Sequence, residues 1–224
     1  MSVYLQGRLE EAFAGSADVQ LVRAIQTGIL LSDGVLESEA WLRGVLGKDV
    51  RGHLRRAAIL SRVHAACKAG DLPFGSSLDH MPRGPFHWVE LSSGGFKAHI
   101  CRSESAGAFP EDTPTRQDER LSNQRSLFDN VVPLKEAAKA AGDLFAWLTF
   151  GVTENSQLGH LCWAMPSADG KAWLAHTNVL FRLAVAQIQV EPEAPPERAK
   201  IKFKEQIEEA LKAPQNAAND DRDV

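Results

Sequence analysis

Residues 86–101, FHWVELSSGGFKAHIC, decide how the middle of this chain folds. Two runs rich in aromatic and β-branched residues flank the serine–glycine stretch 92–95, and such runs around a Gly-Gly turn are typical of a β-hairpin. A similar pattern spans the runs 145–152 and 158–165, with a polar turn between them. The sequence therefore predicts two β-hairpins.

The chain before residue 70 has a different pattern, because its apolar residues recur at helical spacing. We predict about four helices over residues 1–70, which would pack as a helical bundle. The Ser-Asp-Gly stretch 32–34 is expected to end the second helix, and a short third helix is expected over 38–46. The longest helix is expected over 49–69, with Gly70 as its terminator.

The remaining chain completes an α+β fold. The proline- and glycine-rich stretch 71–85 predicts a loop, and the alternating stretch 180–190 predicts a further strand. We therefore expect the helical bundle of 1–70 to be followed by a mostly antiparallel sheet, built from two hairpins plus a further strand. Region 71–190 should hold this sheet and pack with the bundle as one unit. Region 191–224 reads as a linker, an amphipathic C-terminal helix and a disordered acidic tail.

Composition narrows the classes of protein to consider. The chain has 224 residues, 24% of them charged, and a net charge of −4, so any nucleic-acid site must be local. Its three cysteines are an odd and widely spaced set, which favours free thiols in a reducing compartment. The N-terminal residues do not read as a signal peptide, and no apolar run is long enough for a membrane span. We expect a cytoplasmic protein from a bacterium.

Two His-x-Cys pairs, His99 with Cys101 and His160 with Cys162, are the candidate metal ligands. Each pair lies at i and i+2 on a predicted strand, so its two side chains face the same side. If the two strands are neighbours, the four side chains are the ligand set of a structural zinc site, and zinc is the candidate cofactor. The alternative is that the cysteines are small core residues and the histidines are partly buried.

Enzyme motifs give little support to catalysis. Asp79, Glu90 and Lys97 match the residue types of a metal-dependent nuclease or hydrolase. However, a whole turn separates Glu90 from Lys97, and a cross-strand ion pair explains those two residues more simply. The sequence contains no G-x-S-x-G motif and no glycine-rich phosphate loop, and nothing marks an activated cysteine nucleophile. No catalytic residue is predicted.

The helix expected over 49–70 is the candidate nucleic-acid or anion site. Arg51, Arg55 and Arg62 share one stripe of it and could contact phosphates. Arg83 in the following loop could join them, and four further arginines could complete an anion-binding patch if the chain folds back. Those four are Arg102, Arg116, Arg120 and Arg125. The alternative is a solvated amphipathic helix whose other face joins the core.

The C-terminal region is the candidate partner-binding segment. Phe203, Ile207 and Leu211 fall on one helical stripe that could dock into a groove of a protein partner. The alternative is that this stripe packs on its own domain. From these patterns we expect a non-enzymatic binding or regulatory protein that acts through a protein partner. Nucleic-acid binding through helix 49–70 and metal-dependent hydrolysis are the two alternatives.

Overall fold

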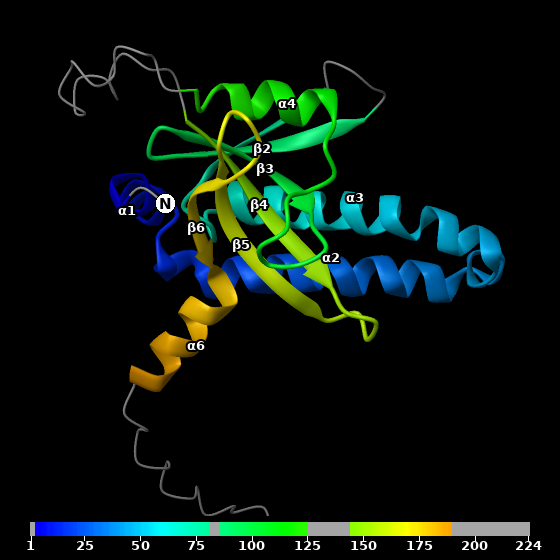
Figure 1. Cartoon of the computed structure of the whole chain (residues 1–224). Helices are drawn as coiled ribbons and strands as arrows, with labels where there is room; N and C mark the ends of the chain where they lie inside the picture. The colour runs from blue at the N-terminus through cyan, green and yellow to red at the C-terminus, as the bar shows by residue number, and fades with distance from the viewer. Residues whose placement is uncertain (1–2, 81–85, 125–143, 190–224) are drawn as a thin grey trace, which may run out of the picture. The chain divides into compact units, whose positions relative to one another are not determined.

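The computed structural model describes residues 3–80, 86–124 and 144–189. The chain divides into two compact units, residues 1–186 and 187–224, and the fold below is that of the first unit. In this unit, helices cover both faces of a six-stranded sheet (Figure 1). The α+β class expected from the sequence is therefore confirmed. Among the described residues, no helix is both long and apolar enough to cross a membrane.

The sheet keeps its strands in sequence order, β1 to β6. The strands are β1 Gly75–His80, β2 His87–Ser93, β3 Phe96–Arg102, β4 Leu144–Val152, β5 Leu158–Pro166 and β6 Trp173–Asn178. All neighbouring strands are antiparallel except β3 and β4, which run parallel. A parallel pair needs a crossover connection, and helix α4 (Pro114–Leu121) lies within it. The sheet is thus mixed rather than wholly antiparallel.

The two expected hairpins are β2–β3 and β4–β5. In the first, Gly94 and Gly95 have φ values of 55° and 77°, which the favoured two-residue hairpin turn requires. The expectation of a loop over 71–85 is wrong for Gly75–His80, because this segment pairs along its length with β2. It is an edge strand whose residues are mostly exposed, so it lacks the apolar alternation that marks a strand in sequence.

The N-terminal helices match the expected bundle only in part. They are α1 Val3–Ala12, α2 Asp18–Ser38 and α3 Val45–Ala69, with short 3₁₀ segments η1 at Gly15–Ala17 and η2 at Ala40–Arg43. The predicted break at 32–34 is wrong, because α2 continues through these residues to Ser38. Within the helix, the Ser32 hydroxyl donates to the Ile29 carbonyl at 2.7 Å. The predicted helix over 38–46 is replaced by η2 and the start of α3. The helices also pack on the sheet rather than only on one another.

The further strand predicted over 180–190 is instead a helix, α6 Val179–Gln189. Val179 is buried and Leu183 packs against the core, whereas Phe181 is exposed, which is a helical and not a two-residue spacing. The Asn178 side-chain oxygen accepts a hydrogen bond from the Phe181 backbone N–H at 3.0 Å and so caps the first turn.

Each face of the sheet has its own apolar cluster. The larger cluster lies between the sheet and helices α1–α3, where Phe13 stacks on Trp163 with ring centroids 3.8 Å apart. On the opposite face, Cys101, Phe145 and Trp147 form a smaller cluster under α4 and the segment before it. Because side chains alternate along a strand, β3 contributes to both clusters.

Helices α2 and α3 lie in close contact at Gly28. A Cβ atom added there would lie 2.7 Å from the Ile59 Cα atom, so Gly28→Ala must push the two helices apart. We expect this substitution to lower the free energy of unfolding by about 1–3 kcal/mol in urea denaturation. Gly34→Ala on the same helix is the control, because a Cβ atom there meets nothing within 4 Å. Equal stability of the two variants would contradict the close contact.

Candidate anion-binding site

The pairing between strands β2 and β3 stops before the end of β3. Their pairing covers only Glu90–Ser93 and Phe96–His99, although β3 continues to Arg102 beside β4. A cavity of about 350 Å³ lies at this end of β3, and its lining comes from α3, β3, β4 and α4. Because β3 and β4 are parallel, their carboxyl ends meet here, which is where open α/β sheets often bind ligands.

The lining of this cavity of about 350 Å³ is strongly positive, and we call it the basic cavity. Its six basic residues are Lys48, Arg51, Arg55 and Arg56 from α3, Arg102 from β3 and Arg116 from α4. The other lining residues are apolar or small, and none of the lining residues is acidic. The α3 residues share one face because they follow helical spacing.

Arg55 is the one member of the set that pairs with a carboxylate of the described residues. Its guanidinium lies 2.8 Å from Asp33 Oδ1, and its buried Nε atom has no hydrogen-bond partner among those residues. Burial acts to raise the pKa of Asp33, but interactions with Ser156 and Arg55 and the charge of Arg51 outweigh it and hold the pKa below its ordinary value. Asp33 is therefore ionised at neutral pH, and its single negative charge offsets part of the positive charge of Arg55 and Arg51.

Among the described residues, Arg56 and Arg116 donate only to uncharged acceptors. Arg56 donates to the His87 carbonyl at 2.8 Å, and Arg116 donates to the Glu111 carbonyl. Burial, together with the nearby charge of Arg116, lowers the pKa of Arg56. The two guanidiniums carry like charges and repel each other. Arg56 reaches the cavity from α3 on one face of the sheet, and Arg116 reaches it from α4 on the other.

The remaining cations, Lys48, Arg51 and Arg102, are exposed and make no hydrogen bond or ion pair with any described residue. Five of the six cations therefore form no direct ion pair with a carboxylate in the described part of the chain, although the charge of Arg51 also acts on Asp33. Gathering like charges in one recess is unfavourable unless an anion balances them. Guanidinium groups also match the geometry of phosphate oxygens, so the arrangement suits a phosphate.

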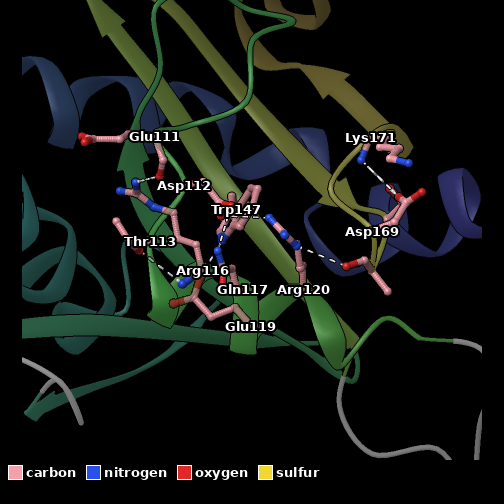
Figure 2. Close-up of polar contacts among 12 residues, drawn as sticks. Glu111, Asp112, Thr113, Arg116, Gln117, Glu119, Arg120, Trp147, Asp169 and Lys171 are labelled. Atoms are coloured by element: carbon pink, nitrogen blue, oxygen red, sulfur yellow. Dashed lines mark hydrogen bonds and ion pairs between the residues drawn. The ribbon is translucent and has the colours of Figure 1, made fainter.

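Contacts along α4 fix the position of Arg116 (Figure 2). Thr113 caps the helix by accepting the Arg116 backbone N–H at 3.3 Å. Glu119 accepts the indole N–H of Trp147 at 2.6 Å with one oxygen. Its other oxygen hydrogen-bonds His99 Nδ1 at 2.7 Å. Arg120 donates to Asp112 at 2.9 Å. The helix is therefore tied to β3 and β4 next to the cavity.

Only some of the residues predicted to bind an anion line the basic cavity. Arg51 and Arg55 line the cavity, whereas Arg62 is exposed farther along α3 and does not. Arg83 lies outside the described residues. Lys48 and Arg56 were missed, although their spacing from Arg51 and Arg55 along one helix could have indicated them.

The structure does not bring the two His-x-Cys pairs together. Strand β4 lies between them, with Thr149 paired to Cys101 on one side and to Cys162 on the other. Two strand spacings separate the cysteines by roughly 10 Å. Burial raises the pKa of Cys101 to about 12 and that of Cys162 to about 11, so both thiols stay protonated at neutral pH. His99 and His160 lie on the same face of the sheet but at different levels along β4, since His99 pairs with Trp147 and His160 pairs with Gly151.

The residues that the sequence suggested for a metal-dependent nuclease or hydrolase do not form a metal site among the described residues. Among the described residues, no group of three or more histidine, cysteine and carboxylate side chains could hold a metal ion. Glu90 and Lys97 form an ion pair at 3.2 Å, which is the simpler explanation of these two residues. Asp79 accepts the Ser77 hydroxyl at 2.6 Å on edge strand β1.

No protein-family model matches this chain, and neither the curated proteins nor the solved structures compared with it gave a match. The fold and the site therefore define the protein by their own features. It belongs to the α+β class and carries a basic cavity where its two parallel strands end.

Proposed function

We propose that this protein binds single-stranded nucleic acid through its phosphates, and that the basic cavity is the binding site. The observation that carries the proposal is the set of six cations around one recess, five of which form no direct ion pair with a carboxylate of the described residues. Phosphate contacts by lysine and arginine provide most of the sequence-independent affinity for nucleic acid. The net charge of −4 confines such binding to a local site.

The arrangement of neighbouring cavities favours a strand over a single small anion. The basic cavity shares Lys48 and Arg51 with a cavity of about 530 Å³ on one side. It shares Arg102 and Val152 with a cavity of about 410 Å³ on the other side. A flexible strand could run across these adjoining recesses with a phosphate held in the basic cavity, because the larger neighbour also presents three carboxylates, Asp33, Glu37 and Glu154.

An aromatic side chain lies beside the cavity. The Arg56 guanidinium is 5.8 Å from the centre of the Phe86 ring, and the imidazole ring of His53 stacks on the same ring with centroids 5.6 Å apart. Phe86 is 47% exposed, so part of the ring remains open to solvent. Proteins that bind single strands commonly combine a basic groove with an aromatic ring on which a base stacks.

Fluorescence anisotropy with a labelled 12-nucleotide single strand tests the proposal. We expect binding that weakens steeply with salt, and we expect Arg51→Ala and Arg116→Ala each to weaken it and to lower the salt slope by about one. Arg62→Ala is the matched control, because Arg62 lies on α3 outside the cavity lining. Each alanine variant removes one positive charge.

Three results would overturn the proposal. The first is the absence of salt-dependent binding, and the second is an equal loss of affinity in Arg62→Ala. The third is displacement of the 12-mer by an equal molar concentration of AMP, which would assign the cavity to a mononucleotide.

The expected protein partner rests on different residues. Phe203, Ile207 and Leu211 lie outside the described residues, so a contact through them stays a prediction. Metal-dependent hydrolysis gains no support from the positions of Glu90 and Lys97, which form an ion pair with each other.

A further inference from the structure

The cavity of about 410 Å³ beside the basic cavity has a different chemistry. It is lined by residues 102–106 after β3 and by residues 151–153 and 159–160 of the β4–β5 hairpin. Its lining contains one cation, Arg102, and one carboxylate, Glu104, and the rest is made of hydroxyl, small or neutral groups. A site of this composition suits a group that has hydroxyls and no charge. We call it the polar cavity.

The imidazole in the polar cavity is uncharged at neutral pH. Burial, together with the nearby His176, lowers the pKa of His160 below its ordinary value. The Ser103 hydroxyl lies 2.9 Å from His160 Nε2 and donates its single proton to the Ser105 carbonyl at 3.1 Å. His160 Nε2 must therefore donate to Ser103. This network brings no positive charge to the polar cavity.

Glu104 is the group in the polar cavity that is best suited to select a ligand. Its side chain is exposed, and it makes no hydrogen bond or ion pair with any described residue. A carboxylate repels phosphate, but it accepts hydrogen bonds from hydroxyl groups. It therefore disfavours a second phosphate at this position and favours a sugar hydroxyl.

Arg102 and Val152 line both cavities and so connect them. A phosphate that binds Arg102 in the basic cavity would leave its attached sugar at the entrance to the polar cavity. We propose that the bound strand is RNA, and that Glu104 accepts a hydrogen bond from the ribose 2′-hydroxyl. This inference rests on the proposed nucleic-acid binding. The 2′-hydroxyl is the group by which a protein distinguishes RNA from DNA at a given position.

The test compares three 12-mers of adenosine with the same label: RNA, DNA and 2′-O-methyl RNA. We expect wild-type protein to bind RNA about tenfold more tightly than either of the other two, because a hydrogen bond to a charged acceptor is lost in both. Glu104→Ala should lower RNA affinity while it leaves DNA affinity unchanged or raised, because it also removes a negative charge. Glu11→Ala is the control, since it removes an exposed carboxylate of α1 that does not line the polar cavity.

The outcomes separate this inference from the proposed function. Equal binding of RNA and DNA, with both weakened by Arg116→Ala, would overturn the RNA inference and leave the proposed function standing. Binding of 2′-O-methyl RNA as tight as that of RNA would also overturn it, because strand shape would then explain the preference. The absence of binding to all three 12-mers would overturn the proposed function itself.

Discussion

Arg182→Ala is expected to lower the free energy of unfolding by about 3–5 kcal/mol. Arg182 on α6 binds both carboxylate oxygens of Asp18 at 2.6 Å, and Asp18 is only 1% exposed at the start of α2. The same guanidinium donates to the Phe13 carbonyl at 3.0 Å. Removal of Arg182 leaves a buried carboxylate without its ion-pair partner, which is one of the most destabilising changes that a single substitution makes.

The pH dependence of this loss identifies its cause. Burial raises the pKa of Asp18 above its ordinary value of 3.8, while the hydrogen bonds and charge of Arg182 oppose the rise. Between the ordinary and the folded pKa, the folded state binds more protons than the unfolded state, so the contribution of Asp18 to stability falls as pH rises. Without Arg182 the pKa of Asp18 should rise further. The loss of stability in Arg182→Ala should therefore be largest at neutral pH and shrink as Asp18 becomes protonated in acid.

Urea denaturation between pH 4 and pH 7, a range that reaches down to roughly the ordinary carboxyl pKa, measures this loss. The double variant Asp18→Asn with Arg182→Ala should recover part of it at pH 7, because the buried group is then neutral. Arg23→Ala is the control on α2, since Arg23 is exposed and should change stability by no more than about 0.5 kcal/mol. A loss in Arg182→Ala that stays constant across this range would contradict the buried-charge explanation.

Local patterns in the sequence predict the elements that local chemistry determines. The first hairpin follows from Gly94 and Gly95, whose positive φ values fit the turn that the dipeptide favours. By contrast, edge strand β1 is held by pairing with β2 and has no apolar alternation of its own. Residues 179–189 are mostly apolar, and they show alternation and helical spacing together. Packing of Leu183 against the core selects the helix.

The candidate site divides in the same way. The stripe of Arg51 and Arg55 is visible in the sequence, because one helix carries both residues. Arg102 and Arg116 join them only because β3 pairs with β4 in parallel and α4 lies within the crossover. No local pattern determines that pairing. Strand order likewise separates the two His-x-Cys pairs, because β4 lies between β3 and β5. The sequence predicts that the two members of each pair face the same side, but it does not predict the distance between the pairs.

Reversing two charges of the basic cavity should have the largest effect on ligand binding. We expect the double variant Arg51→Glu with Arg116→Glu to bind the 12-nucleotide single strand at least about 100-fold more weakly than wild type, a loss of about 2.7 kcal/mol. Each substitution removes a phosphate contact and places a carboxylate where a phosphate would lie. Neither arginine forms a direct ion pair with a carboxylate of the described residues, so the fold should survive, and circular dichroism checks this.

The control for charge reversal is the double variant Arg23→Glu with Arg62→Glu. Both arginines are exposed and lie outside the cavity lining, and the control lowers the net charge by the same amount. If the recess itself binds phosphate, the control should lose no more than a few-fold in affinity, because salt screens exposed charges about 10 Å or more from the ligand. If both double variants lose affinity equally, long-range repulsion explains the loss and the cavity has no special role. A large difference between them would assign binding to the end of the parallel strand pair, where α3 and α4 bring their arginines together.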